Sequence, residues 1–119
     1  MKKATGITRI INATRYSLEG MVATFRNEAA FRQEIALVCI GVPIALLLHI
    51  TNVERAVLIG SLLLVLMMEL LNTAIEAAIN RISQDLHPLS KCAKDAGSAA
   101  VLLALVNAAC MWGIIVGGV

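Results

Sequence analysis

The chain divides into four blocks of apolar residues, and each block has the length and spacing of a helix. Over residues 7–25, large apolar side chains recur at i, i+3, i+4 and i+7, with polar side chains on the opposite face. Three longer apolar blocks follow at about residues 30–50, 54–80 and 94–118. Each is long enough to cross a hydrocarbon layer of about 30 Å. The pattern predicts an all-α integral membrane protein. An amphipathic helix at about residues 6–27 would lie on the membrane surface, and three helices would span the bilayer.

Composition supports a membrane location and a single domain over residues 1–119. The chain is 59% hydrophobic and only 15% charged, and its mean hydropathy is +0.83. A soluble domain of 119 residues is less apolar than this. Cys39, Cys92 and Cys110 show no metal or disulfide spacing, so they are interpreted as apolar fillers, with Cys92 expected in a loop.

The distribution of basic residues predicts the orientation. If the spans are limited to their apolar cores (residues 35–53, about 56–75, and 96 onward), nine of the ten Lys and Arg residues precede the first core or lie between the second and the third, and only Arg55 lies in the other loop. The positive-inside rule places the N-terminus in the cytoplasm and the C-terminus outside. Residues 81–95 are expected to form a polar cytoplasmic connection, with Asp95 as one candidate for the cap of the third span.

A polar stripe interrupts the second span. In the segment ELLNTAIEAAIN, polar side chains share one face of the helix: Glu69, Asn72, Thr73, Glu76 and Asn80. Glu69 lies deepest, and no Lys or Arg is expected inside a span to pair with it. A carboxylate in the hydrocarbon region costs a few kcal/mol, so Glu69 is by default a functional candidate.

The predicted topology gathers five charged groups at the cytoplasmic boundary: Glu28, Glu69, Glu76, Lys94 and Asp95. Carboxylates suit Mg²⁺, a lysine suits phosphate, and a partly desolvated glutamate suits a general base. These parts match metal-assisted phosphoryl transfer. A proton-coupled transporter centred on Glu69 and a purely structural oligomer stay open as alternatives. Taken alone, the i, i+4 spacing of Glu28 and Arg32 predicts a surface ion pair. Small residues spaced four apart, ending in the Gly113–Gly117 pair, favour helix association.

Three segments, NEAAFRQE (27–34), ELLNTAIEA (69–77) and AKDAGSAAVL (93–102), closely resemble the bacterial integral-membrane diacylglycerol kinases, and residues 6–20 are also similar. The resemblance covers nearly the whole chain. It implies a homotrimer of three-span subunits in the bacterial inner membrane, with the C-terminus in the periplasm. It implies transfer of the γ-phosphoryl group of MgATP to diacylglycerol, giving phosphatidic acid, with no nucleic-acid partner.

The resemblance also implies roles for individual residues. Glu69 is similar to the catalytic base, and Asn72 to a residue that positions the reacting groups. Glu28 and Glu76 resemble the ligands of Mg²⁺. The implied ATP contacts are Arg9, Tyr16, Glu28, Glu76, Asp85, Leu86, His87, Lys94 and Asp95. The implied lipid contacts are Arg9, Thr14, Arg15, Tyr16, Ser17, Ala30, Phe31, Arg32, Gln33, Glu34, Arg55, Glu69, Ser98 and Trp112.

Some positions depart from the family pattern. Relatives often carry tryptophan along the surface helix and at the end of the first span, a basic residue at position 19 and an acidic one at position 49. This chain has Leu18, Glu19, Phe25, Leu47 and His49 there. A sister group acts on undecaprenol, but NEAAFRQE resembles the diacylglycerol branch.

Overall fold

Four helices make up the part of the chain that the computed structural model describes, residues 5–118. They are α1 (Gly6–Asn27), α2 (Ala29–Leu47), α3 (Asn52–Ile82) and α4 (Pro88–Gly117). No strand occurs within the described residues, so the all-α prediction is confirmed. Lys2 and Lys3, which the charge argument counts, lie outside the described residues.

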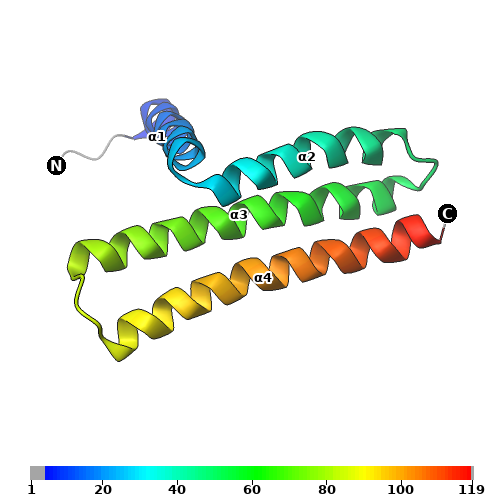
Figure 1. Cartoon of the computed structure of the whole chain (residues 1–119). Coiled ribbons are helices and arrows are strands. Elements are labelled where there is room, and N and C mark those ends of the chain that lie inside the picture. The colour runs from blue at the N-terminus through cyan, green and yellow to red at the C-terminus, as the bar shows by residue number, and fades with distance from the viewer. Residues whose placement is uncertain (1–4, 119) are drawn as a thin grey trace.

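The three long helices lie side by side in chain order, with α3 in the middle (Figure 1). Helix α3 packs on both neighbours, and the Trp112 ring of α4 reaches past it toward Gly41 of α2. The three helices have 19, 31 and 30 residues, and each contains an 18-residue segment with a mean hydropathy of 1.7, 2.0 and 2.3 respectively, so each can cross a membrane. Three spans preceded by one further helix agree with the sequence prediction.

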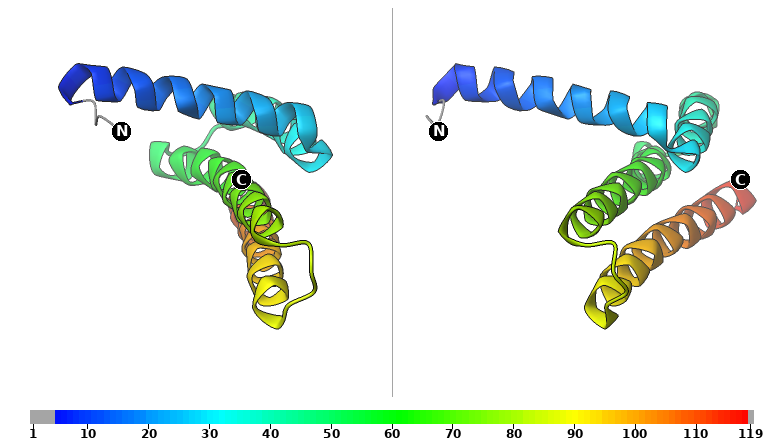
Figure 2. Two further views of the ribbon diagram at one scale, coloured as in Figure 1. Left: turned by 90° about the vertical axis from the view of Figure 1, so that its left-hand side faces the viewer. Right: turned by 60° about the vertical axis from the view of Figure 1, so that its left-hand side comes forward.

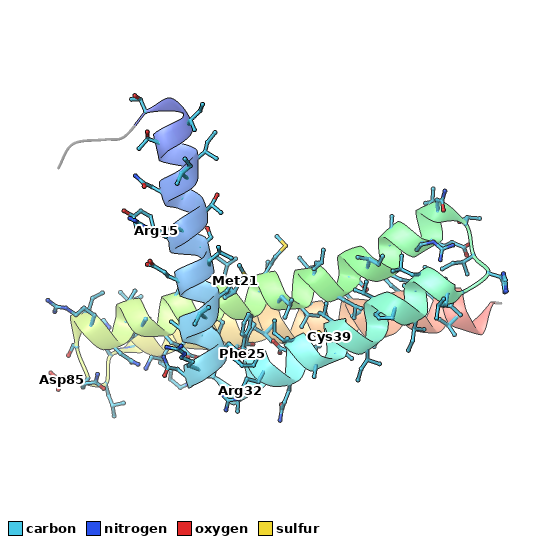
Figure 3. The ribbon with its side chains drawn as sticks, turned by 90° about the horizontal axis from the view of Figure 1, so that it is seen from above. Arg15, Met21, Phe25, Arg32, Cys39 and Asp85 are labelled. Atoms are coloured by element: carbon cyan, nitrogen blue, oxygen red, sulfur yellow. The ribbon has the colours of Figure 1, made fainter. Side chains whose placement is uncertain are left out.

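Helix α1 runs across the direction of the long helices and contacts only α2 and α3 (Figure 2). The elbow between α1 and α2 is Glu28, whose backbone is extended at φ −121° and ψ 111°. The Arg32 guanidinium donates to the carbonyls of Phe25 (2.8 Å) and Arg26 (3.1 Å), which are acceptors left free by the end of α1 (Figure 3). Arg32 therefore holds the elbow instead of forming the predicted surface pair with Glu28.

Local capping determines where α3 and α4 begin. Thr51 and Glu54 form a reciprocal capping box at the start of α3. At the start of α4, His87 Nδ1 accepts from the Leu89 N–H at 3.1 Å, and proline occupies the first helical position.

These boundaries correct three sequence predictions. The connection between α3 and α4 covers only residues 83–87, because both helices continue into the polar stretch expected to be a loop. Asp95 lies inside α4 and is not its cap. Cys92 is also helical, not in a loop.

A single chain buries only a small core. The buried core where α3 meets α4 consists of Val65, Ala104 and Ala108, with Leu64 and Met68 packed against it. Large apolar side chains along all three long helices remain exposed, which suits lipid as the surrounding solvent. Gly113 has no atom within 4 Å of an added Cβ, and the same is true of Gly117.

The end of the bundle away from Glu69 is held by two side chains. Arg55 donates to three carbonyl oxygens at the α2–α3 turn, those of Ala45, Leu48 (3.3 Å) and Ile50 (3.2 Å). Trp112 Nε1 of α4 donates to the Leu58 carbonyl of α3 at 3.3 Å.

Candidate active site

Two carboxylates are buried on neighbouring helices. Glu69 of α3 is 6% exposed and Glu34 of α2 is 8% exposed. Neither forms an ion pair within the described residues. Glu34 Oε2 is buried and makes no hydrogen bond there either. The predicted isolation of Glu69 from Lys and Arg is therefore present in the structure, but a second carboxylate accompanies it.

Two further carboxylates were predicted to share the site with Glu69. Glu28 lies at the α1–α2 elbow, and Glu76 lies two turns further along α3 than Glu69, on the same face of the helix. The Glu28 side chain makes no capping hydrogen bond at either helix end, so its carboxylate is available to a ligand. The described residues contain no set of three His, Cys, Asp or Glu side chains close enough to enclose a metal ion. Two carboxylates without an enclosing cage suit Mg²⁺, which retains waters and substrate phosphates in its shell.

The side-chain amide of Asn72 links this group to α4. Its Nδ2 donates to Glu76 Oε1 at 3.1 Å, which orients that carboxylate. Its Oδ1 is buried without a hydrogen-bond partner in the described residues. The amide fits against α4 because residue 97 is glycine: a Cβ added there would lie 2.5 Å from Asn72 Oδ1.

A polar cavity of about 660 Å³ opens where α3 ends and α4 begins. Lys94 Nζ donates to Asn80 Oδ1 at 2.7 Å across its wall. Lys91 donates to Asp95 at 2.5 Å, and this hydrogen bond together with the Asp95 charge raises the pKa of Lys91. Five of the residues implied as ATP contacts line the cavity: Asp85, Leu86, His87, Lys94 and Asp95. The volume and the lysines suit a phosphorylated ligand.

The α1 residues do not join this cavity within one chain. Helix α1 makes no contact with α4, so Arg9 and Tyr16 are separated from Lys94 and Asp95. The Tyr16 hydroxyl accepts from Arg15 at 3.4 Å, and Arg15 also approaches Glu19 at 3.9 Å. The Thr14 and Ser17 hydroxyls donate to carbonyls of α1 itself. Thr14 and Arg15 instead line an open groove of about 670 Å³ along α1.

The residues implied as lipid contacts occupy three different places. In the 30–34 segment, Phe31 and Glu34 are buried, while Ala30, Arg32 and Gln33 are exposed. Ser98 is exposed on α4, next to the glycine that faces Asn72. Arg55 precedes Glu69 by fourteen residues of one helix, or about 21 Å. Its guanidinium is engaged by backbone carbonyls, and Trp112 is also in the far half of the bundle.

Two features escaped the sequence analysis. Glu34 was considered only as part of a polar segment and an implied lipid pocket, although its i+3 spacing from the apolar Phe31 marks it as facing the interior. The approach of Asn72 to Gly97 joins residues that are 25 positions apart. No pattern within one segment could have indicated that contact.

Comparison with known proteins identifies a family for this arrangement. The sequence model for prokaryotic diacylglycerol kinase matches residues 15–116. Diacylglycerol kinase of Pseudomonas aeruginosa is 51% identical over 98% of this chain and 95% of its own length. The Haemophilus influenzae enzyme of the same name is 47% identical over 100% of this chain and 98% of its own length. The diacylglycerol kinase of Escherichia coli K12 is 50% identical over 93% of this chain and 91% of its own length.

Proposed function

The chain belongs to the prokaryotic diacylglycerol kinase family, and we propose that it transfers the γ-phosphoryl group of ATP to the free hydroxyl of diacylglycerol. The products are phosphatidic acid and ADP. The observation that carries this proposal is Glu69, a buried carboxylate without an ion-pair partner in the described residues, on a helix that leads directly to the polar cavity. In this proposal the lipid approaches Glu69 from the membrane, and the nucleotide enters the cavity from water.

Glu69 acts as the general base. Its carboxylate takes the proton of the lipid hydroxyl while that oxygen forms a bond to the γ-phosphorus and the bond from phosphorus to the ADP oxygen breaks. Burial removes water that would otherwise compete for the phosphoryl group. Asn72 keeps Glu76 in position through its 3.1 Å hydrogen bond. Phosphoryl transfer depends mainly on such positioning and on charge stabilisation.

The nucleotide occupies the cavity between α3 and α4. Lys94 contributes positive charge toward the phosphates, and the Ser83–His87 turn closes the other side of the cavity. The 2.7 Å bond between Lys94 and Asn80 fixes the ammonium near the end of the polar stripe. Asp85, Leu86, His87 and Asp95 complete the nucleotide contacts.

Mg²⁺ is the metal that the available ligands fit, with Glu28 and Glu76 as its protein ligands. Glu28 has no competing cap interaction, and Glu76 keeps one oxygen outside its hydrogen bond with Asn72. When bound, the ion neutralises developing charge on the phosphate oxygens. The protein supplies two carboxylates, and waters and phosphate oxygens complete the shell.

The working unit in this proposal is a homotrimer of single-domain subunits. The unpartnered Gly113 and Gly117 and the thin core support association through the long helices. Because α1 does not reach α4 of its own chain, Arg9 and Tyr16 contact a nucleotide only if α1 of one subunit reaches the cavity of another. In the inner membrane, the basic-residue distribution places the N-terminus in the cytoplasm and the C-terminus in the periplasm.

The test is phosphate transfer from labelled MgATP in mixed micelles, with diacylglycerol and undecaprenol offered in parallel. We expect label on diacylglycerol for the wild type and a loss of at least about 10²-fold for Glu69→Gln, which keeps the size and removes the base. Glu19→Gln, an exposed carboxylate on α1, is the matched control and should retain activity.

The other outcomes separate the alternatives. Label on undecaprenol alone would assign the protein to the sister group that acts on undecaprenol. Wild-type turnover by Glu69→Gln removes that residue from the role of base. If neither lipid is labelled by folded protein, and proton-driven flux appears in liposomes, the transporter interpretation replaces the kinase.

A further inference from the structure

We propose that Lys91 determines the affinity of the cavity between α3 and α4 for a nucleoside triphosphate, because it neutralises Asp95 and so leaves the charge of Lys94 for the phosphates. The inference rests on the proposed function, which puts a nucleotide in this cavity. It goes further by giving a role to a lysine that the reaction does not otherwise use. Lys91 acts on the nucleotide through Asp95, so it is a positioning residue and not a catalytic one.

The charges in the cavity wall are balanced. Two carboxylates and two ammonium groups line it: Asp85, Asp95, Lys91 and Lys94. Their formal charges cancel, so the wall carries no net charge. A nucleoside triphosphate carries several negative charges, and an uncompensated carboxylate in the wall would repel it. Without Lys91 the wall would hold two carboxylates against one ammonium group, a net charge of one negative unit.

The two lysines of the wall have different partners. Lys91 Nζ donates to Asp95 Oδ2 at 2.5 Å, one turn further along α4. Lys94 Nζ donates to Asn80 Oδ1 of α3 at 2.7 Å, and this amide oxygen carries no formal charge. Within the described residues, Lys94 forms no ion pair. Lys91 therefore compensates Asp95, whereas Asn80 holds the Lys94 ammonium in place without neutralising it.

Helix stability does not account for the pair of Lys91 and Asp95. Helix α4 begins at Pro88, so Lys91 lies near the positive end of the helix dipole, where a basic side chain is unfavourable. An i, i+4 pair stabilises a helix more when the acidic residue comes first, and here the basic residue comes first. The two side chains are 78% and 63% exposed, so the ion pair adds little to folding. Its position in the cavity wall explains it better.

The decisive variant is Lys91→Gln, with KM and kcat for MgATP measured in mixed micelles at saturating diacylglycerol. KM should rise at least about threefold, because the unpaired Asp95 repels the phosphates, and kcat should stay within about twofold of the wild type. Lys91→Arg keeps the charge and should keep the wild-type KM. The rise in KM should shrink at high ionic strength, because salt screens exposed charges.

Arg81→Gln is the matched control. It removes the same charge at the same end of the bundle, from an exposed residue of α3 that does not line the cavity. Its KM for MgATP should equal that of the wild type. If Arg81→Gln raises KM as much as Lys91→Gln does, the effect belongs to the overall charge of this surface and the inference is overturned.

A double-mutant cycle tests whether Lys91 acts through Asp95. In the Asp95→Asn background, Lys91→Gln should change KM by less than about 1.5-fold, because the charge that Lys91 compensates is already absent. An equal rise in KM in both backgrounds would mean that Lys91 contacts the phosphates by itself, and it would overturn the role assigned here.

Binding of MgADP to the intact protein in micelles, measured by titration calorimetry, gives a Kd that does not depend on turnover. We expect Lys91→Gln to raise this Kd at least about threefold as well. If the wild type labels diacylglycerol while Lys91→Gln keeps both KM and Kd, the inference is overturned and the proposed function stands. If no lipid is labelled but Kd rises in Lys91→Gln, the proposed function fails and the role of Lys91 stands. A wild type that binds no MgADP overturns the inference.

Discussion

Gly97→Ala should disable the site by displacing Asn72, a residue on a different helix. The added Cβ would lie 2.5 Å from Asn72 Oδ1, and ordinary contact begins at 3.4 Å, so the amide oxygen must retreat by about 0.9 Å. Asn72 Nδ2 moves with it. The bond from Nδ2 to Glu76 Oε1 is already 3.1 Å, close to the long end of ordinary hydrogen bonds at about 3.2 Å. The substitution therefore breaks the contact that orients Glu76.

The magnitude follows from that displacement. Misplacing a positioning group by about 1 Å costs on the order of 10²-fold in rate, so we expect kcat to fall between about tenfold and 10²-fold. The Mg²⁺ concentration for half-maximal activity should rise, because Glu76 is the proposed ligand that loses its support. Overpacking itself should cost about 1–3 kcal/mol of stability. Kinetics against Mg²⁺ in mixed micelles and thermal unfolding of the same samples measure these effects.

Two control glycines separate displacement of the site from overpacking. Gly41→Ala meets Leu62 Cδ1 at the same 2.5 Å but lies away from Asn72, so it should lose stability and keep kcat. Gly60→Ala has no atom within 4 Å and should change neither. The reasoning is refuted if Gly97→Ala keeps wild-type kcat and Mg²⁺ dependence. It also fails if Gly41→Ala loses as much kcat as Gly97→Ala.

Two further predictions concern the metal and the far end of the bundle. Glu28→Gln and Glu76→Gln should each shift the Mg²⁺ titration to at least about tenfold higher concentration, and an unchanged titration contradicts metal ligation by that residue. Arg55→Lys keeps the charge but cannot hold three carbonyl oxygens at once, so the unfolding free energy should fall by about 1–3 kcal/mol while kcat at saturating lipid stays the same. A loss of lipid affinity with unchanged stability would instead assign Arg55 to lipid contact.

The fold class could be predicted from helical periodicity and hydropathy. The amphipathic helix and three spans follow from spacing and length alone, since backbone groups in lipid must be satisfied within the segment. The residues at which the helices begin and end were harder to predict. The polar residues 88–95 suggested a loop, but proline at the first helical position and the His87 cap start α4 at Pro88, about six residues before the predicted apolar block.

The sequence could place candidate site residues together only where one helix carries them. Glu69, Asn72 and Glu76 recur at intervals of three and four residues, so any helix places them on one face. The position of Glu28 required the elbow, which depends on Arg32 reaching back to the end of α1. A pairwise surface interaction was the wrong interpretation of Arg32 because helix-end carbonyls compete for its guanidinium.

The sequence by itself determined the helices, their membrane-spanning length and the unusual carboxylate within the second span. These properties depend on interactions a few residues apart, or on the transfer of whole segments from water to lipid. Only the tertiary structure decided that Glu34 is buried, that Gly97 admits Asn72, and that α1 stays apart from the α4 cavity. Those relations depend on how helices rotate and cross when they pack. Rotation and crossing are decided by side-chain shape at contacts between distant parts of the chain.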